Sequence, residues 1–233
     1  IKRAKALETM AYELCKKAAS QNILYFETRF APSLCETPGF TAQQAVEAAL
    51  AGLKKGEKDF GVASGVIVCL LRNISSKHNE RNLELAKKFK GKGVVALDLA
   101  NDEAARPLAA FADYYREAKR AGLATTVHAG EVYPAPDLKT VLDLGIDRVG
   151  HAAALARYPD LMQEFARRKI PLEINLTSNL RTGAVRRIKD HPARRYFEAG
   201  IPISFNTDDP GVFGIDLNSE YRAAIDEAGF TKK

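Results

Sequence analysis

The chain has 233 residues, of which 46% are hydrophobic, enough for a sizeable buried core and a common length for one α/β barrel domain. No run approaches the roughly 20 apolar residues of a membrane span, so we expect no membrane partner. The formal net charge is +6, but acids are interspersed among the basic residues and no basic tract alternates with aromatic residues. We therefore expect no nucleic-acid partner.

The cysteines and the first residues of the chain indicate a compartment. Cys15, Cys35 and Cys69 are an odd number, are widely spaced and form no CxxC pair. This usage is typical of free thiols in a reducing environment and excludes a cysteine-rich zinc site. The first residues also lack the apolar run and cleavage site of a secretory signal. We expect a cytoplasmic protein.

Seven short runs rich in apolar and β-branched residues are predicted as strands. The runs are continuously apolar, which is typical of strands buried on both faces of a parallel sheet. They are residues 23–30, 62–70, 94–100, 124–127, 148–150, 171–176 and 202–206.

Helical patterns separate these strands. The pair Thr41 and Gln44 has the spacing of a capping box, and Pro136 and Gly145 bracket another helix in the expected order. The predicted helices centre on residues 7–18, 41–53, 83–89, 108–115, 138–142, 161–165 and 196–197.

The strict alternation of strands and helices indicates right-handed βαβ units. Such units build either an open doubly wound sheet or a closed barrel. No glycine-rich turn follows the first strand, which disfavours a dinucleotide-binding sheet. We predict a TIM (β/α)8 barrel with about seven of its eight strands in this chain, organised as one domain over residues 1–233.

Reactive side chains follow several predicted strands. His128 and Glu131 lie at the end of the fourth, His151 at the end of the fifth, and Asp208 and Asp209 after the last. The carboxyl ends of barrel strands form the active-site face, so we expect these groups to share one mouth. Ala129 and Gly130 can turn the backbone and bring His128 and Glu131 to the same side.

Each group also has a structural interpretation. His128 can face solvent while Glu131 caps a helix. His151 can be a buried histidine satisfied by a neighbour, and the acids before Pro210 are a common helix-start signal. His78 and His191 fall in segments that we expect to be exposed.

Taken together, the groups suggest metal-assisted hydrolysis. His128 and Asp208 can be zinc ligands, since a catalytic zinc site takes histidine and carboxylate ligands and keeps a position open. His151 can be the base or the group that orients the attacking water, and Glu131 the acid.

The motif at residues 126–131, TVHAGE, resembles the signature of adenosine deaminases, and the resemblance spans essentially the whole chain. Further segments agree with the family in order and spacing. They are YFETRFAP at 25–32, VVALDLA at 94–100, RVGH at 148–151, LTSN at 176–179 (similar to bacterial members) and NTDDP at 206–210.

The resemblance implies a zinc-dependent barrel that converts adenosine and deoxyadenosine to inosine-type products and ammonia in purine salvage. His128 and Asp208 would be zinc ligands, and Glu131 would donate a proton to purine N1. His151 would deprotonate or orient the attacking water, and Asp209 would hold that water or contact N7. The PCxxC motif of cytidine-type deaminases is absent.

The chain departs from the family at two places. Asn101 stands where the family usually has the glycine that binds the purine N3 edge, a position at which Asn tolerates positive φ. The His-x-His pair that ends the family's first strand does not occur. We therefore expect one zinc per active site with two further histidine ligands from a segment not in this chain, and we expect the first strand and the C-terminal helices to be absent.

Two alternative functions remain open. A related enzyme would deaminate adenine or an N6-modified adenine nucleotide. A catalytically inactive homologue would act as a binding protein instead. The retained Glu131, His151 and Asp209 favour an enzyme, and the absent His-x-His pair favours the inactive homologue.

Overall fold

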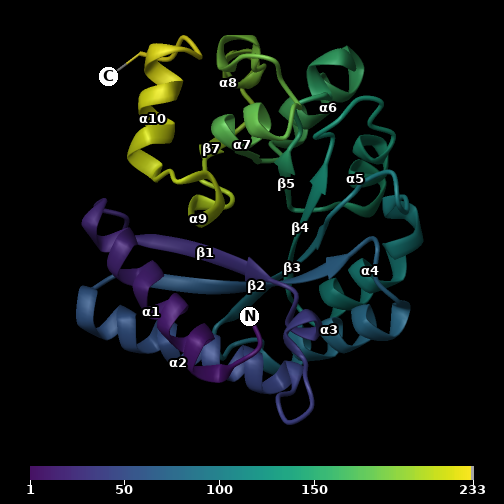
Figure 1. The fold of residues 1–233 in the computed structure, drawn as a ribbon. Helices are drawn as coiled ribbons and strands as arrows, with labels where there is room; N and C mark the ends of the chain where they lie inside the picture. The colour runs from purple at the N-terminus through teal and green to yellow at the C-terminus, as the bar shows by residue number, and fades with distance from the viewer. Residues whose placement is uncertain (232–233) are drawn as a thin grey trace. The chain divides into compact units, whose positions relative to one another are not determined.

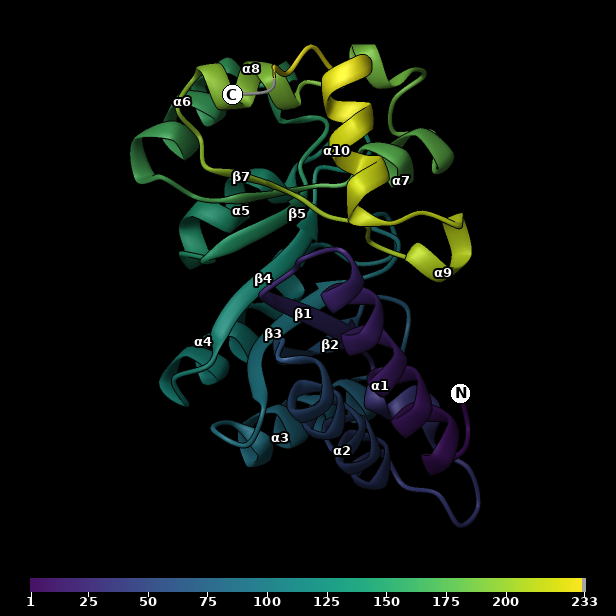
Figure 2. The same ribbon diagram turned by 90° about the vertical axis from the view of Figure 1, so that its left-hand side faces the viewer.

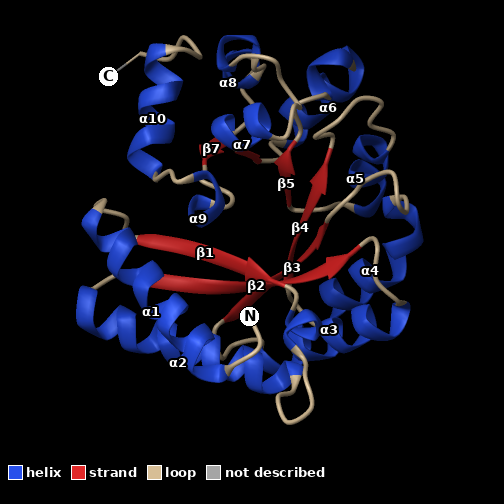
Figure 3. Cartoon of the chain, in the orientation of Figure 1, coloured by secondary structure: helices blue, strands red, loops and turns tan. Residues whose placement is uncertain are grey.

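The computed structural model describes residues 1–231. By their internal contacts these residues form two compact units. The first comprises Ile1–Asp102 and Asp113–Thr125, and the second comprises Glu103–Ala112 and the residues from Thr126 onward. Strands alternate with helices through both units (Figure 1, Figure 3).

Every strand pair is parallel, and the hydrogen-bonded strand order equals the chain order. An open doubly wound sheet reverses its order at a switch point, whereas consecutive strands of a (β/α)8 barrel are neighbours. The barrel class is therefore confirmed for the described strands, while the single domain over 1–233 stays a prediction. The strands are β1 Tyr25–Phe30, β2 Ala63–Leu71, β3 Val94–Ala100, β4 Ala124–Ala129, β5 Arg148–His151, β6 Leu172–Ile174 and β7 Ile203–Phe205.

Each predicted helix is present, and residues 1–231 contain three α-helices outside the predicted set, Leu176–Arg181, Pro210–Phe213 and Leu217–Asp226. None within residues 1–231 is long and apolar enough to cross a bilayer. The α-helices are α1 Ala4–Ser20, α2 Ala42–Phe60, α3 Ser76–Phe89, α4 Ala112–Arg120, α5 Asp137–Leu144, α6 Pro159–Arg168, α7 Leu176–Arg181, α8 Ala193–Glu198, α9 Pro210–Phe213 and α10 Leu217–Asp226. The 3-10 helices are η1 Pro32–Cys35, η2 Leu108–Phe111, η3 Leu155–Arg157 and η4 Ile188–Asp190.

The predicted sixth strand, residues 171–176, is too long. β6 ends at Ile174, Asn175 is the N-cap residue, and α7 begins at Leu176. Leu176 is fully buried, so the apolar run continues from the strand into the first turn of the helix. A short apolar run does not distinguish these two conformations.

The capping box at the start of α2 is confirmed. The Thr41 Oγ1 accepts the Gln44 N–H at 3.2 Å, and the Gln44 Oε1 accepts the Thr41 N–H at 2.8 Å. These two bonds satisfy backbone donors that have no partner within a helix.

In the first unit, α1 and α2 lie side by side (Figure 1, Figure 2). Glycine permits the close approach: a Cβ added to Gly52 of α2 would meet the backbone oxygen of Glu8 in α1 at 2.1 Å and the Cβ of Ala11 at 2.9 Å. The first of these is a clash with backbone, which cannot swing aside as a side chain can. The helix spacing therefore depends on this position lacking a side chain.

In the second unit, α10 packs against α7 and β7. Phe205 of β7 makes edge-on ring contacts with Tyr221 of α10, at 5.5 Å between centroids, and with Phe230, at 5.1 Å. This packing places the buried Glu220 of α10 beside the first turn of α7, where its Oε2 accepts the Thr177 N–H at 3.3 Å. α10 thereby fixes the position of α7.

We expect Gly52→Ala to destabilise the protein. Alanine improves helix propensity by roughly 1 kcal/mol, but overpacking against backbone typically costs about 1–3 kcal/mol. We expect the steric cost to exceed the gain in propensity. Urea unfolding measures the difference. Lys54→Ala, on the exposed face of the same helix, is the control and should stay within about 0.5 kcal/mol of the parent. A Gly52→Ala protein more stable than the parent would contradict the close packing.

Candidate active site

A tight turn at the end of β4 positions His128 and Glu131. Gly130 adopts φ +72°, which reverses the chain directly after the strand. Glu103 braces this turn, because its Oε2 accepts the Gly130 N–H and its Oε1 accepts the Glu131 N–H, each at 2.8 Å. Glu103 therefore fixes the turn that separates His128 from Glu131.

His151 lies between them at the end of β5. Its ring centroid is 5.0 Å from that of His128, and its Nε2 is 3.9 Å from the Glu131 Oε2. The side chain is only 2% exposed. Burial, reinforced by the nearby His128, lowers the pKa of His151, while Glu131, Asp208 and Glu173 oppose this shift. The net lowering favours a neutral imidazole.

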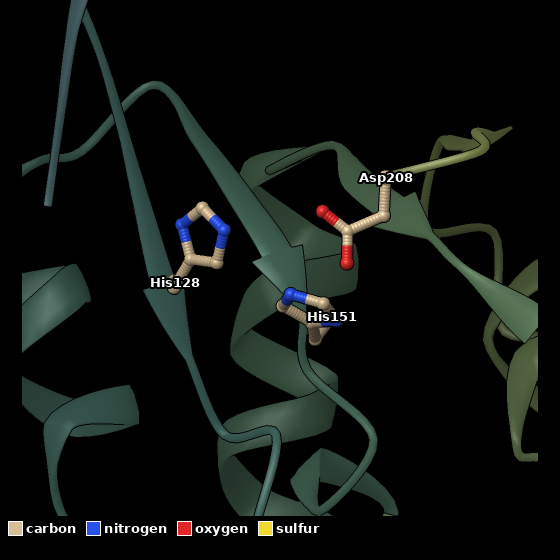
Figure 4. Close-up of side chains that lie close together, drawn as sticks. All are labelled: His128, His151 and Asp208. Atoms are coloured by element: carbon tan, nitrogen blue, oxygen red, sulfur yellow. The ribbon is translucent and has the colours of Figure 1, made fainter. Parts of the chain in front are cut away.

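Asp208, after β7, completes a cluster of possible metal ligands. One ligand atom from each of His128, His151 and Asp208 can be chosen so that all three lie within 4.8 Å of one another. The side chains converge from three separate segments (Figure 4). Asp208 is exposed, and its Oδ2 accepts the Ser178 hydroxyl at 2.7 Å. Imidazole nitrogen and carboxylate oxygen are ligands that Zn²⁺ takes, so the donor set fits this metal.

α7 and its flanking residues hold the cluster through one polar face. Ser178 binds Asp208, Asn179 lies 2.9 Å and Asn175 3.2 Å from the Nδ1 of His151, and Thr182 donates to the Glu131 Oε1 at 2.7 Å. None of these four residues was among the predicted site residues. Their spacing of i, i+3, i+4 and i+7 marks one face of a helix and was the available signal.

Asp209 and Asn101 follow the ends of β7 and β3. Asp209 is exposed and precedes α9, where its backbone oxygen accepts the N–H groups of Val212 and Phe213. Asn101 belongs to the first unit and has φ +77°, in the left-handed region that glycine enters most readily and asparagine tolerates. The roles of both residues stay predictions.

The two remaining histidines differ in burial. His78 is exposed, as expected, with its Nδ1 2.7 Å from the Ser75 hydroxyl. The expectation that His191 is exposed was wrong, since the residue is only 5% exposed. Its Nε2 lies 3.0 Å from the Asn179 Oδ1. This tertiary contact is not visible in the local sequence. Burial lowers the pKa of His191 to about 4.

Comparison with known proteins gives one family. The family model described as adenosine deaminase matches residues 1–233. The chain is 37% identical over 216 residues to the adenosine deaminase of Streptococcus agalactiae serotype Ia, covering 93% of this chain and 64% of that protein. It is 35% identical over 221 residues to that of Enterococcus faecalis, covering 95% and 66%. The chain thus spans 64–66% of the length of these curated relatives.

Solved structures of two deaminases and one amidohydrolase resemble the chain closely. An adenine deaminase from Arthrobacter aurescens has a TM-score of 0.89 at 25% identity, covering 99% of this chain and 71% of that one. An amidohydrolase from Burkholderia ambifaria with bound zinc has a TM-score of 0.91 at 27% identity, covering 99% and 65%. The N6-methyl-AMP deaminase from Arabidopsis thaliana has a TM-score of 0.89 at 27% identity, covering 99% and 70%.

The buried His191 predicts a pH dependence of stability. Its pKa falls from 6.5 to about 4 on folding, so between these values the unfolded chain binds a proton that the folded chain does not. The free energy of unfolding therefore decreases as the pH falls through this window. The parent's free energy of unfolding should fall between pH 7.5 and pH 5, and we expect this fall to be about 2 kcal/mol smaller in the His191→Gln protein.

Urea unfolding at the two pH values measures this difference. His78→Gln is the matched control, since His78 is exposed and the substitution should leave the pH dependence as it is in the parent. Equal pH dependence in the parent and the His191→Gln protein would contradict a neutral buried His191.

Proposed function

The chain belongs to the adenosine deaminase family, and we propose that it carries much of the active site of an enzyme that hydrolyses adenosine and deoxyadenosine to their inosine products and ammonia. One observation carries the proposal: His128, His151 and Asp208 converge within 4.8 Å, with Glu131 against His151. The family's curated members at 35–37% identity are named adenosine deaminases, which supports the choice of substrate.

The proposed cofactor is one zinc ion held by His128 and Asp208. A related amidohydrolase contains zinc, and the nitrogen and oxygen donors here suit that metal. When bound, zinc would supply the Lewis-acid chemistry that activates water at neutral pH. We expect two further histidine ligands from residues outside this chain.

Glu131 is the proposed proton donor. A proton delivered to purine N1 draws electron density from C6 and makes that carbon more susceptible to attack. The Thr182 hydroxyl donates to Oε1 of Glu131, while Oε2 is the oxygen nearer His151. The hydrogen bond to one oxygen limits the orientations that the carboxyl group can take.

The remaining proposed groups position water and substrate. His151 orients the attacking water with its buried imidazole. Asp209 holds the same water or contacts purine N7. Asn101 supplies its backbone N–H to the N3 edge, and its φ of +77° lies in the left-handed region that glycine enters most readily.

Two solved structures favour specific alternatives within the family. One neighbour is an adenine deaminase and another an N6-methyl-AMP deaminase, both with a TM-score of 0.89. These substrates share the 6-amino or 6-alkylamino purine ring and differ in what is attached to N9. A catalytically inactive homologue that binds a purine is the further alternative.

A substrate comparison tests the proposal. We expect the purified full-length protein, loaded with zinc, to deaminate adenosine and deoxyadenosine with a higher kcat/KM than adenine or N6-methyl-AMP. The ultraviolet change on deamination measures all four rates. Preferential turnover of adenine or N6-methyl-AMP would select the corresponding alternative, and tight adenosine binding without turnover of any substrate would support the inactive homologue.

Glu131→Gln should lower kcat for adenosine by at least about 100-fold, because an amide cannot deliver the proton to N1. We expect KM to change little and the zinc content to stay that of the parent. Glu227→Gln, an exposed position after α10, makes the same chemical change and should leave kcat unaltered. A near-normal kcat in the Glu131→Gln enzyme would show that another group donates the proton.

A further inference from the structure

We propose that His191 and Asn179 form a buried relay that holds the proton of His151 on Nε2, which makes His191 a positioning residue of the site. The relay comprises three side chains, each at most 5% exposed, that are joined in series. It begins at a backbone amide and ends at the imidazole that faces Glu131. Its consequence for catalysis rests on the proposed deaminase function, but its geometry does not.

The backbone amide sets the direction of the first bond. The Ala193 N–H donates to the Nδ1 of His191 at 3.0 Å, and a backbone N–H can only donate. The Nδ1 therefore carries a lone pair. Burial lowers the pKa of His191 to about 4, so the ring is neutral at pH 7. A neutral imidazole that accepts at Nδ1 carries its proton on Nε2.

This proton determines the orientation of Asn179. The His191 Nε2 lies 3.0 Å from the Asn179 Oδ1, which can only accept. The amide NH₂ of the fully buried Asn179 therefore faces the His151 Nδ1, at 2.9 Å. An NH₂ group can only donate, so the His151 Nδ1 must accept. The Nδ2 of Asn175, at 3.2 Å, approaches the same nitrogen.

His151 is thereby left with an N–H at Nε2, the nitrogen that lies 3.9 Å from the Glu131 Oε2. A protonated ring nitrogen has no lone pair for a metal ion. The relay therefore gives His151 a different role from the two proposed ligands, His128 and Asp208, although all three belong to one cluster. His151 serves as a hydrogen-bond donor to the attacking water in place of a metal ligand.

Nitrogen NMR of the full-length protein tests the relay directly. With histidine labelled by ¹⁵N in the ring, two-bond nitrogen–proton correlations distinguish the Nε2–H from the Nδ1–H tautomer. We expect the Nε2–H form at both His151 and His191 at pH 7.5, assigned by single histidine substitutions. In protein loaded with ¹¹³Cd, a metal–nitrogen coupling should appear for His128 and be absent for His151.

A proton on Nδ1 of His151, or a ¹¹³Cd coupling to its ring, would overturn the proposal. This measurement needs no turnover and the tautomer assignment needs no metal. If the protein is inactive but both His151 and His191 show the Nε2–H tautomer, the proposed function is contradicted while the relay is supported.

Two variants test the effect on catalysis. His191→Phe removes the donor to Asn179, lets the amide rotate and should lower kcat by about 10- to 100-fold, with a smaller change in KM. His191→Gln retains an N–H donor and should recover most of this loss. His78→Gln is the exposed control. A His191→Phe protein with parental kcat and only the Nε2–H form of His151 would refute the relay, and if that variant does not fold, the parent's NMR spectrum decides.

Discussion

The site depends on the hydrogen bonds that one short helical segment donates. Ser178 donates to Asp208, Asn179 to His151, and Thr182 to Glu131. Side chains that follow three different strands are therefore held by the same helical segment. A helix of six residues is too short to be stable alone. α10 provides the missing stabilisation, because it packs against α7 and its buried Glu220 accepts an N–H from the first turn.

The strand ends themselves are held in an uncommon conformation. His151, Ala152 and Asp208 have φ of +67°, +51° and +55°, which costs roughly 1–3 kcal/mol for each residue that is not glycine. The turn after β5 is fixed in part by the Ala152 N–H, which bonds the backbone oxygens of Ala129 and Gly150. Such strain persists only where the surroundings determine it, and here it coincides with the converging side chains.

Features that depend on local pattern were predictable from the sequence. Continuous apolar runs located the seven strands, and their carboxyl ends located His128, His151 and Asp208. The helix α7 was not predicted, because the apolar run passes from β6 through Leu176 without a break and hides the start of the helix, although the polar residues at 175, 178, 179 and 182 have helical spacing. The burial of His191 was not predicted either, since it depends on a contact with Asn179, which belongs to another segment.

The partners of His151 limit what this histidine can do. A carboxylate at Nδ1 would make the ring more basic, because its charge stabilises the imidazolium. The groups at that nitrogen are amides of Asn175 and Asn179, which donate to the neutral ring and disfavour a second proton. Burial acts in the same direction and lowers the pKa further. Of the two roles that the sequence left open, base or orienting group, the neighbours of His151 favour the orienting group, with Nε2–H as its donor.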